Sequence, residues 1–317
     1  VCCMPNTDPV NDSASVTQYI LERARACSPV AVYPIAAITR GSMGEELAPY
    51  AELKEAGAWA VSDDGRPVTR PSVMRRALEY AGSLGLVVID HCEDPDLAGN
   101  GVMHEGVVSA QLGLPGIPAD AEYLPVRRDL AMARLTGQRV HIAHVSVRRS
   151  VDAVRAAKKK RIPVTAEATP HHFALTEEAV SSFDTNAKMN PPLRSRDDVD
   201  AVIEGLADGT IDCIVTDHAP HAYEEKLVEF DRAPNGIIGL QTAVPLALDR
   251  LVRTDRISLK RMGDALSCAP ARILGLGSKG RVAAGADADF TVLCLRREFC
   301  LKPEDVKSLS RNSPFLG

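Results

Sequence analysis

The chain has 317 residues, of which 45% are hydrophobic, enough for the core of one large α/β barrel, a fold that typically takes ~250 residues. The net charge of −5 argues against a nucleic-acid-binding protein, which needs a basic face. No run of about 18 uncharged apolar residues occurs, so we expect no membrane partner.

The cysteines predict a reduced, cytoplasmic protein rather than a disulfide scaffold. No C-x-x-C pair occurs, and several cysteines lie in apolar strand-like runs, as buried free thiols do. The chain opens on the apolar residues 1–4 and stops at 313–317 with no terminal helix, so we expect both ends to be cut. The eight cysteines are Cys2, Cys3, Cys27, Cys92, Cys213, Cys268, Cys294 and Cys300.

In chain order, short β-rich runs alternate with helical patterns. Helix-period segments at 13–26 and 147–159 follow the capping residues Asp12 and Ser146. Near-continuous apolar strands separated by helices predict a parallel sheet covered by helices. The predicted strands are residues 1–4, 30–38, 58–61, 86–91, 140–144, 164–168 and 213–216.

Seven strands with polar residues just after them predict a TIM-type (β/α)8 barrel whose first strand would lie upstream of Val1. An open doubly wound sheet is the alternative. The pattern changes near residue 280, where a turn and a strand at 289–295 indicate part of a small β element. We therefore predict an incomplete barrel at 1–279 and a C-terminal β element at 280–317.

Three candidate metal ligands end apolar runs. His91 follows 86–90, His144 follows 140–143, and Asp217 follows 213–216. One histidine at a strand end is more often structural, but two histidines and an aspartate at strand ends of one barrel converge on its mouth. Such N and O ligands suit Zn²⁺ or a similar divalent ion.

Three further polar motifs are candidates for the site. Asp63-Asp64 before a glycine is a common turn, and one of the carboxylates could bridge two metal ions. Asn190 stands before two prolines, as a turn residue or as an amide that binds substrate. His221, past a proline in Asp217–His221, lies on a loop where it would suit an anionic substrate.

Together these motifs resemble the class I dihydroorotases of bacteria, within the amidohydrolase superfamily. Related hydantoinases and allantoinases usually bridge their metals with a carbamylated lysine, where this chain has Asp63-Asp64-Gly65. The matching segments run in family order across nearly the whole chain: Met4-Pro5-Asn6-Thr7, Ser62-Asp63-Asp64-Gly65, His91-Cys92-Glu93-Asp94, His141-Ile142-Ala143-His144-Val145-Ser146, Glu167-Ala168-Thr169-Pro170-His171-His172, Asn190-Pro191-Pro192-Leu193-Arg194, Thr216-Asp217-His218-Ala219-Pro220-His221 and Ala233-Pro234-Asn235-Gly236-Ile237-Ile238-Gly239-Leu240.

The resemblance implies a role for each site residue. His91 and His144 would bind one metal, Asp64 rather than Asp63 would bridge, and Asp217 would bind the other metal and act as general acid/base. The His-x-His-x-Arg segment of the family's first strand is absent, so the chain alone is expected to be inactive. The implied substrate-binding residues are Asn6, Asn190, His221, Asn235 and Gly236.

The implied activity is that of a dihydroorotase, which closes N-carbamoyl-L-aspartate to (S)-dihydroorotate in pyrimidine biosynthesis. Metal-activated hydroxide, with one or two Zn²⁺ or other divalent ions per chain, would carry the reverse reaction. The resemblance also implies a homo-oligomer and aspartate transcarbamoylase as a candidate partner. Two alternatives stay open: another cyclic amidohydrolase of hydantoinase or allantoinase type, or an inactive scaffold for aspartate transcarbamoylase.

Overall fold

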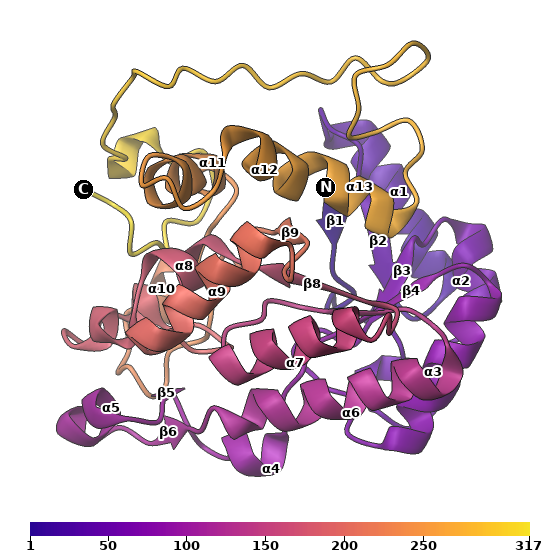
Figure 1. Ribbon diagram of the computed structural model, residues 1–317, viewed down its shortest axis with the longest axis horizontal. Helices are drawn as coiled ribbons and strands as arrows, with labels where there is room; N and C mark the ends of the chain where they lie inside the picture. Colours follow the sequence, from indigo (N-terminus) through magenta and orange to yellow (C-terminus); the bar gives the residue numbers. More distant parts are fainter. The chain divides into compact units, whose positions relative to one another are not determined.

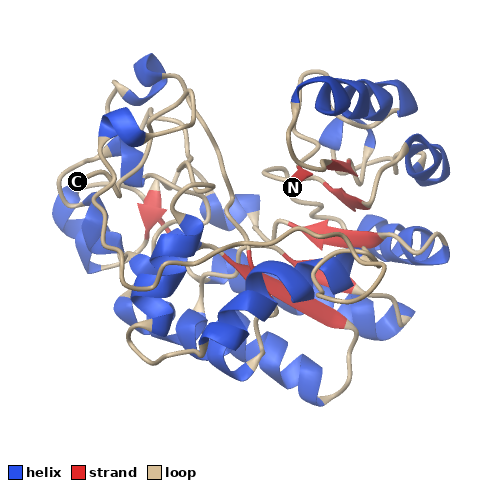
Figure 2. Ribbon diagram, turned by 90° about the horizontal axis from the view of Figure 1, so that it is seen from above, coloured by secondary structure: helices blue, strands red, loops and turns tan.

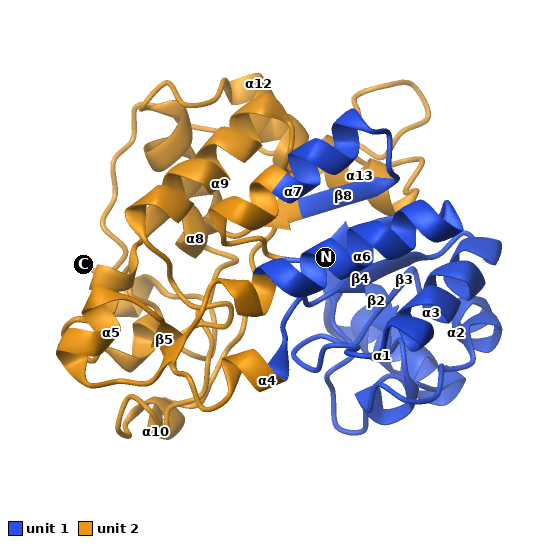
Figure 3. Ribbon diagram, turned by 60° about the horizontal axis from the view of Figure 1, so that its bottom comes forward, with its two compact units in different colours: residues 1–95, 123–143, 153–166 blue, residues 96–122, 144–152, 167–317 orange.

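A computed structural model describes residues 1–317. The chain divides into two compact units, coloured separately in Figure 3. Unit 1 comprises residues 1–95, 123–143 and 153–166, and unit 2 comprises residues 96–122, 144–152 and 167–317. Each unit is therefore built from segments far apart in the sequence.

The sheet of unit 1 is parallel throughout, and its strands lie in chain order. Cys2 pairs with Tyr33, Ile35 with Ala60, and the ladder continues through the remaining strands. A helix or a longer segment follows each strand, as parallel pairing requires. The strands are β1 (Cys2–Cys3), β2 (Tyr33–Ala36), β3 (Ala60–Ser62), β4 (Val87–Asp90), β7 (Val140–Ile142) and the first three residues of β8 (Val164–Ala168).

Helices cover this sheet because each buries one apolar stripe. Along α3, Val73, Met74, Ala77 and Leu78 are fully buried at helical spacing, and the helix packs on β4. Figures 1 and 2 show helices alongside these strands. The helices of unit 1 are α1 (Ala14–Cys27), α2 (Tyr50–Ala56), α3 (Pro71–Ser83), and the larger parts of α6 (Asp120–Thr136) and α7 (Arg148–Lys159).

Unit 2 has less sheet and more helix. The end of β8 pairs in parallel with β9 (Cys213–Ile214), and β5 (Met103–His104) pairs with β6 (Gly116–Ile117). Ser195 caps α9 by accepting a hydrogen bond from the Asp198 N–H. Its helices are α4 (Pro95–Ala98), α5 (Val107–Leu112), α8 (Pro170–Ala174), α9 (Arg196–Asp208), α10 (Tyr223–Lys226), α11 (Ala243–Ala247), α12 (Leu259–Gly263) and α13 (Ala269–Leu274), with the helical segments Leu248–Val252 and Asp264–Cys268 extending α11 and α12.

The predicted fold class is confirmed, because the strand order is β1-β2-β3-β4-β7-β8-β9 with parallel neighbours. Each of the seven strands predicted for the barrel is present; β8 has the predicted bounds, and the other six are shorter than predicted. Sequence patterns missed β5 and β6, which have two residues each and therefore carry no period.

The strand predicted at 289–295 is wrong. These residues form no strand. Phe290 and Val292 are exposed, so most of the apolar run is not covered, and no neighbouring strand pairs with it. The division into 1–279 and 280–317 stays a prediction.

Candidate active site

Sheet register brings Asp64 and His91 together in unit 1. Ser62 at the end of β3 pairs with Ile89 in β4, and each candidate ligand lies two residues further along its chain. Parallel strands end at the same edge, so the two side chains emerge at one level. A carboxylate oxygen of Asp64 and a ring nitrogen of His91 lie within 4.8 Å of one another.

The neighbouring aspartates 63 and 64 have different environments. Asp63 is buried, and its Oδ1 accepts hydrogen bonds from the N–H groups of Ile38 (2.8 Å) and Thr39 (3.0 Å). Its Oδ2 accepts a bond from the Thr39 hydroxyl. Asp64 instead accepts one bond at Oδ2, from Asn6 Nδ2 (2.9 Å), and its Oδ1 has no hydrogen-bond partner within the chain. Asp63 therefore holds the loop, while Asp64 has an oxygen available for a cation.

His91 is 3% exposed, and its neighbours in sequence, Asp90 and Cys92, are also buried. Asp90 Oδ2 accepts hydrogen bonds from Arg128 Nη2 (3.2 Å) and Cys92 Sγ (3.4 Å). Burial, and then the nearby charge of Asp129, raise the pKa of the Asp90 carboxyl well above its ordinary value. The backbone before His91 thus lies against a buried, charged cluster.

Two predicted ligands adopt a backbone conformation that is rare outside glycine. The φ angle is +29° at His144 and +44° at Asp217. Asp and His adopt positive φ more readily than most residues, but conformations of this kind cost of the order of 1–3 kcal/mol. They persist where the surrounding structure fixes them and are concentrated at functional sites.

The chain on either side of His144 is held at several points. In unit 1, the Ala143 N–H donates to the Asp90 carbonyl (3.1 Å), so the chain entering His144 lies beside the chain entering His91. In unit 2, the Glu122 carboxylate accepts hydrogen bonds from the N–H groups of Ser146 and Val147 and from the Ser146 hydroxyl. His144 is therefore fixed from both directions.

The loop of Asp217 is joined to the glycine-containing loop 235–240 of unit 2. His218 Nδ1 accepts the Gly239 N–H (3.0 Å), and His218 pairs with Ile237 in a parallel bridge. Burial lowers the pKa of His218, consistent with its neutral, accepting form. At Gly236 the φ angle is +151°, and a Cβ would lie 2.8 Å from the Ala219 carbonyl. Only glycine fits this close approach.

His221 and Asn235 are also brought together. His221 Nε2 lies 2.8 Å from the Asn235 carbonyl, and its Nδ1 lies 3.4 Å from a Glu225 carboxylate oxygen. Sequence reasoning missed Asn312, whose buried amide donates to the carbonyls of Ala219 (2.9 Å) and Gly236 (3.0 Å). Since Asn312 lies far along the chain in an irregular segment, no local pattern signals it.

Asn190 is positioned by the turn that follows it. The Asn190–Pro191 peptide bond is cis, and the Pro191 carbonyl lies 2.9 Å from His172 Nε2. The other ring nitrogen of His172 lies 2.8 Å from the Thr169 hydroxyl. Burial lowers the pKa of His172 to about 3, so it is neutral and joins the end of β8 to the Asn190 turn.

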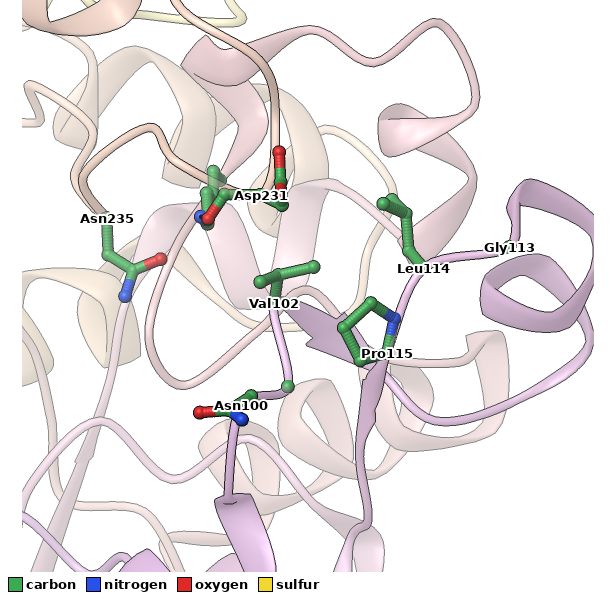
Figure 4. Close-up of a pocket in the computed structure, with 9 residues that line it drawn as sticks. Asn100, Val102, Gly113, Leu114, Pro115, Asp231 and Asn235 are labelled. Atoms are coloured by element: carbon green, nitrogen blue, oxygen red, sulfur yellow. Dashed lines mark hydrogen bonds between the residues drawn. The ribbon is translucent and has the colours of Figure 1, made fainter.

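A surface pocket in unit 2 has a volume of about 560 Å³ (Figure 4). Of the predicted site residues, only Asn235 lines it, together with Asn100, Lys188 and Asp231. Neither Asp64 nor His91 lines this pocket. We therefore infer the reaction from the chemistry of that pair of side chains and not from the pocket.

The donor set of Asp64 and His91 fits a divalent metal. It pairs an imidazole nitrogen with a carboxylate oxygen, the ligand types that Zn²⁺ takes in hydrolytic enzymes. The free Oδ1 of Asp64 gives that carboxylate a position from which to bind an ion. Unit 1 thus places side by side two groups that could hold a metal ion.

Comparisons with known proteins agree with this chemistry. Residues 1–150 match the family model described as "Dihydro-orotase-like". The dihydroorotase of Syntrophus aciditrophicus is 53% identical over 100% of this chain and 74% of its own length, and that of Anaeromyxobacter dehalogenans is 54% identical over 100% and 73%.

Solved structures with the same fold include two hydantoinases. The L-hydantoinase of Arthrobacter aurescens superposes with a TM-score of 0.88 at 23% identity, covering 100% of this chain and 72% of that one. A D-hydantoinase from Thermus sp. gives 0.73 at 26% identity, covering 91% and 65%.

The parallel α/β sheet is the fold of these hydantoinases, and side chains at its strand ends could hold a metal ion. For the family, identity above 50% along the entire chain is decisive. The chain belongs to the dihydroorotase family. None of its helices combines the length and hydropathy that a membrane crossing needs.

Proposed function

We propose that this protein is a dihydroorotase, which reversibly closes N-carbamoyl-L-aspartate to (S)-dihydroorotate with loss of water. The observation that carries the proposal is the 53–54% identity, over the whole chain, to relatives named dihydroorotase. The paired Asp64 and His91 at adjacent strand ends support it, because amide hydrolysis at neutral pH needs an activated water.

The residues that would hold the metal are Asp64, His91, His144 and Asp217. Asp64 is proposed as the bridging carboxylate in preference to Asp63, whose oxygens are occupied by Ile38 and Thr39. Zn²⁺ is the ion that this donor set suits, one or two per chain. When bound, a divalent ion of this kind polarises an amide carbonyl and lowers the pKa of water from 15.7 to about 7.

Asp217 is proposed as the general acid/base. Its carboxylate would take a proton from the attacking water and deliver it to the ring nitrogen that leaves. Proton transfer by a positioned side chain typically contributes 10²–10⁴-fold to a rate. The positive φ of Asp217 supports this role, since a strained backbone at a strand end aims the side chain in a fixed direction.

Substrate binding is proposed for Asn6, Asn190, His221, Asn235 and Gly236. The loop containing Asn235 and Gly236 is held by Asn312, so its backbone groups are fixed before substrate arrives. His221 has a chain partner at each ring nitrogen, so binding a substrate carboxylate requires it to exchange one of them.

A second candidate function is hydrolysis of another cyclic amide, favoured by the TM-score of 0.88 to a hydantoinase. The two are separated by assaying the product of the complete gene with dihydroorotate, hydantoin and dihydrouracil. We expect a kcat/KM for dihydroorotate that exceeds the others by at least 100-fold. A preference for hydantoin would reverse the order of the proposals, and turnover of none would favour a scaffold.

The wider setting of the protein is also proposed from the family. Pyrimidine biosynthesis, a homo-oligomeric state and association with aspartate transcarbamoylase follow from the resemblance. The eight cysteines are all free thiols, which supports a reducing compartment such as the cytoplasm. Size-exclusion chromatography with light scattering, with and without aspartate transcarbamoylase, tests the assembly.

A further inference from the structure

Arg128 on helix α6 donates a hydrogen bond from each of its three guanidinium nitrogens within unit 1. Its Nε donates to Asp129 Oδ1 (2.7 Å), its Nη1 to the Val68 carbonyl (2.6 Å), and its Nη2 to Asp90 Oδ2 (3.2 Å). Asp90 and Asp129 are at most 1% exposed. A partly buried arginine with three separate acceptors is fixed in position and direction.

Two of these acceptors belong to the segments that carry proposed metal ligands. Asp90 immediately precedes His91 at the end of β4, and Val68 lies four residues after Asp64 in the loop that follows β3. Strand pairing fixes Ser62 opposite Ile89, but both ligands lie beyond the last paired residues. Arg128 therefore joins the two segments where the backbone ladder no longer does.

The acidic groups around Arg128 account for its charge. One ligand atom each of Asp90, Cys92 and Asp129 lies within 4.8 Å of the others, an arrangement that attracts a cation. The guanidinium occupies that role, since it donates to Asp90 and Asp129 and lies beside them in ion pairs at 3.2 and 2.7 Å. These buried acidic groups therefore bind the Arg128 guanidinium and hold it in place.

We propose that Arg128 is a positioning residue that sets the separation of Asp64 and His91, so that the two can hold a metal ion as soon as it binds. The inference rests on the proposed function, which makes Asp64 and His91 metal ligands. Arginine is required because lysine offers a single nitrogen and cannot reach three acceptors in one plane. Groups that orient metal ligands typically change metal affinity by 10–100-fold when they are altered.

The test is Arg128→Lys in the product of the complete gene, with Arg134→Lys as the control. Arg134 lies on the same helix, is exposed and has no polar partner. Zn²⁺ affinity is measured by competition with a chelator, and the unfolding temperature of the metal-free protein is measured in parallel. We expect Arg128→Lys to bind Zn²⁺ 10–100-fold more weakly, and excess Zn²⁺ to restore its turnover. The metal-free variant should also unfold at a lower temperature, because the buried carboxylates of Asp90 and Asp129 lose hydrogen bonds.

A merely structural role predicts lower stability without weaker Zn²⁺ binding. Lower stability of metal-free Arg128→Lys with wild-type Zn²⁺ affinity would overturn the proposal, as would wild-type values for both. If Arg128→Lys does not fold, the Zn²⁺ affinity of Asp129→Asn is measured instead. This variant keeps the shape of the group that accepts the Arg128 Nε hydrogen bond and removes its charge. We expect that variant to bind Zn²⁺ about 10-fold more weakly, and wild-type affinity would overturn the proposal.

The outcome is distinguishable from failure of the proposed function. If the wild-type protein binds no Zn²⁺, or if Asp64→Ala binds it normally, the metal-site assignment itself is wrong. If the wild-type protein binds Zn²⁺ and loses it in Asp64→Ala, while Arg128→Lys and Asp129→Asn bind normally, only the role of Arg128 is wrong.

Discussion

Replacing the adjacent aspartates one at a time separates the proposed ligand from its structural neighbour. Asp63→Ala removes the acceptor of two buried backbone N–H groups and one hydroxyl. Hydrogen bonds to a charged group are worth about 1.5–3 kcal/mol each, and a buried donor left without an acceptor costs about 1–3 kcal/mol. Because the loop can relax in part, the total cost is smaller than the sum of these contributions. We expect the free energy of unfolding to fall by about 3–5 kcal/mol.

Asp64→Ala removes one hydrogen bond from an exposed amide, so its cost to stability should be below about 1 kcal/mol. The assay is thermal unfolding together with elemental analysis of the product of the complete gene. At roughly 2–4 °C per kcal/mol, Asp63→Ala should unfold about 10 °C lower than the wild-type protein. Below its unfolding temperature it should retain most of its metal. Asp64→Ala should unfold nearly as the metal-free wild type does and lose metal. Normal metal content in Asp64→Ala would refute the bridging assignment.

Three further variants test other parts of the site. Asp217→Asn should lower kcat by 10²–10⁴-fold with unchanged unfolding, since an amide cannot carry the proton; near-normal kcat in both reaction directions would remove Asp217 from this role. His221→Ala should raise KM and weaken an orotate-like inhibitor while metal content stays constant; lost metal with unchanged inhibitor affinity would reverse that assignment. Burial and the Arg194 cation lower the pKa of His104 to about 4, so the unfolded chain binds this proton first and stability falls as pH drops from about 6.5 to 4. His104→Gln should remove about 3 kcal/mol of that acid-dependent loss in urea titrations, and an identical pH profile would show that His104 does not titrate in this range.

The sequence predicts the positions of the strands because each is an apolar run followed by a polar residue. It also pairs Asp64 with His91 as ligand candidates, and parallel register explains why they meet. It could not separate Asp63 from Asp64 by environment, because the donors that hold Asp63 come from Ile38 and Thr39, more than twenty residues away.

Long-range contacts are the part that no local pattern carries. In the sequence, Arg128 is one of several charged residues along a helix. Its proposed role follows only from its contacts with Val68 and Asp90, which are distant in sequence. Asn312 is similar, since it holds loops more than 70 residues away. The strand predicted at 289–295 was wrong for the opposite reason: its apolar run is favourable locally but has no partner to pair with.

The most direct test of the central claim is the initial rate of dihydroorotate hydrolysis by the product of the complete gene, before and after removal of metal. The proposed function predicts that a chelator abolishes turnover and that added Zn²⁺ restores it in the wild-type protein but not in Asp64→Ala. Turnover of dihydroorotate that persists in the metal-free protein, at the rate of the loaded enzyme, would contradict it.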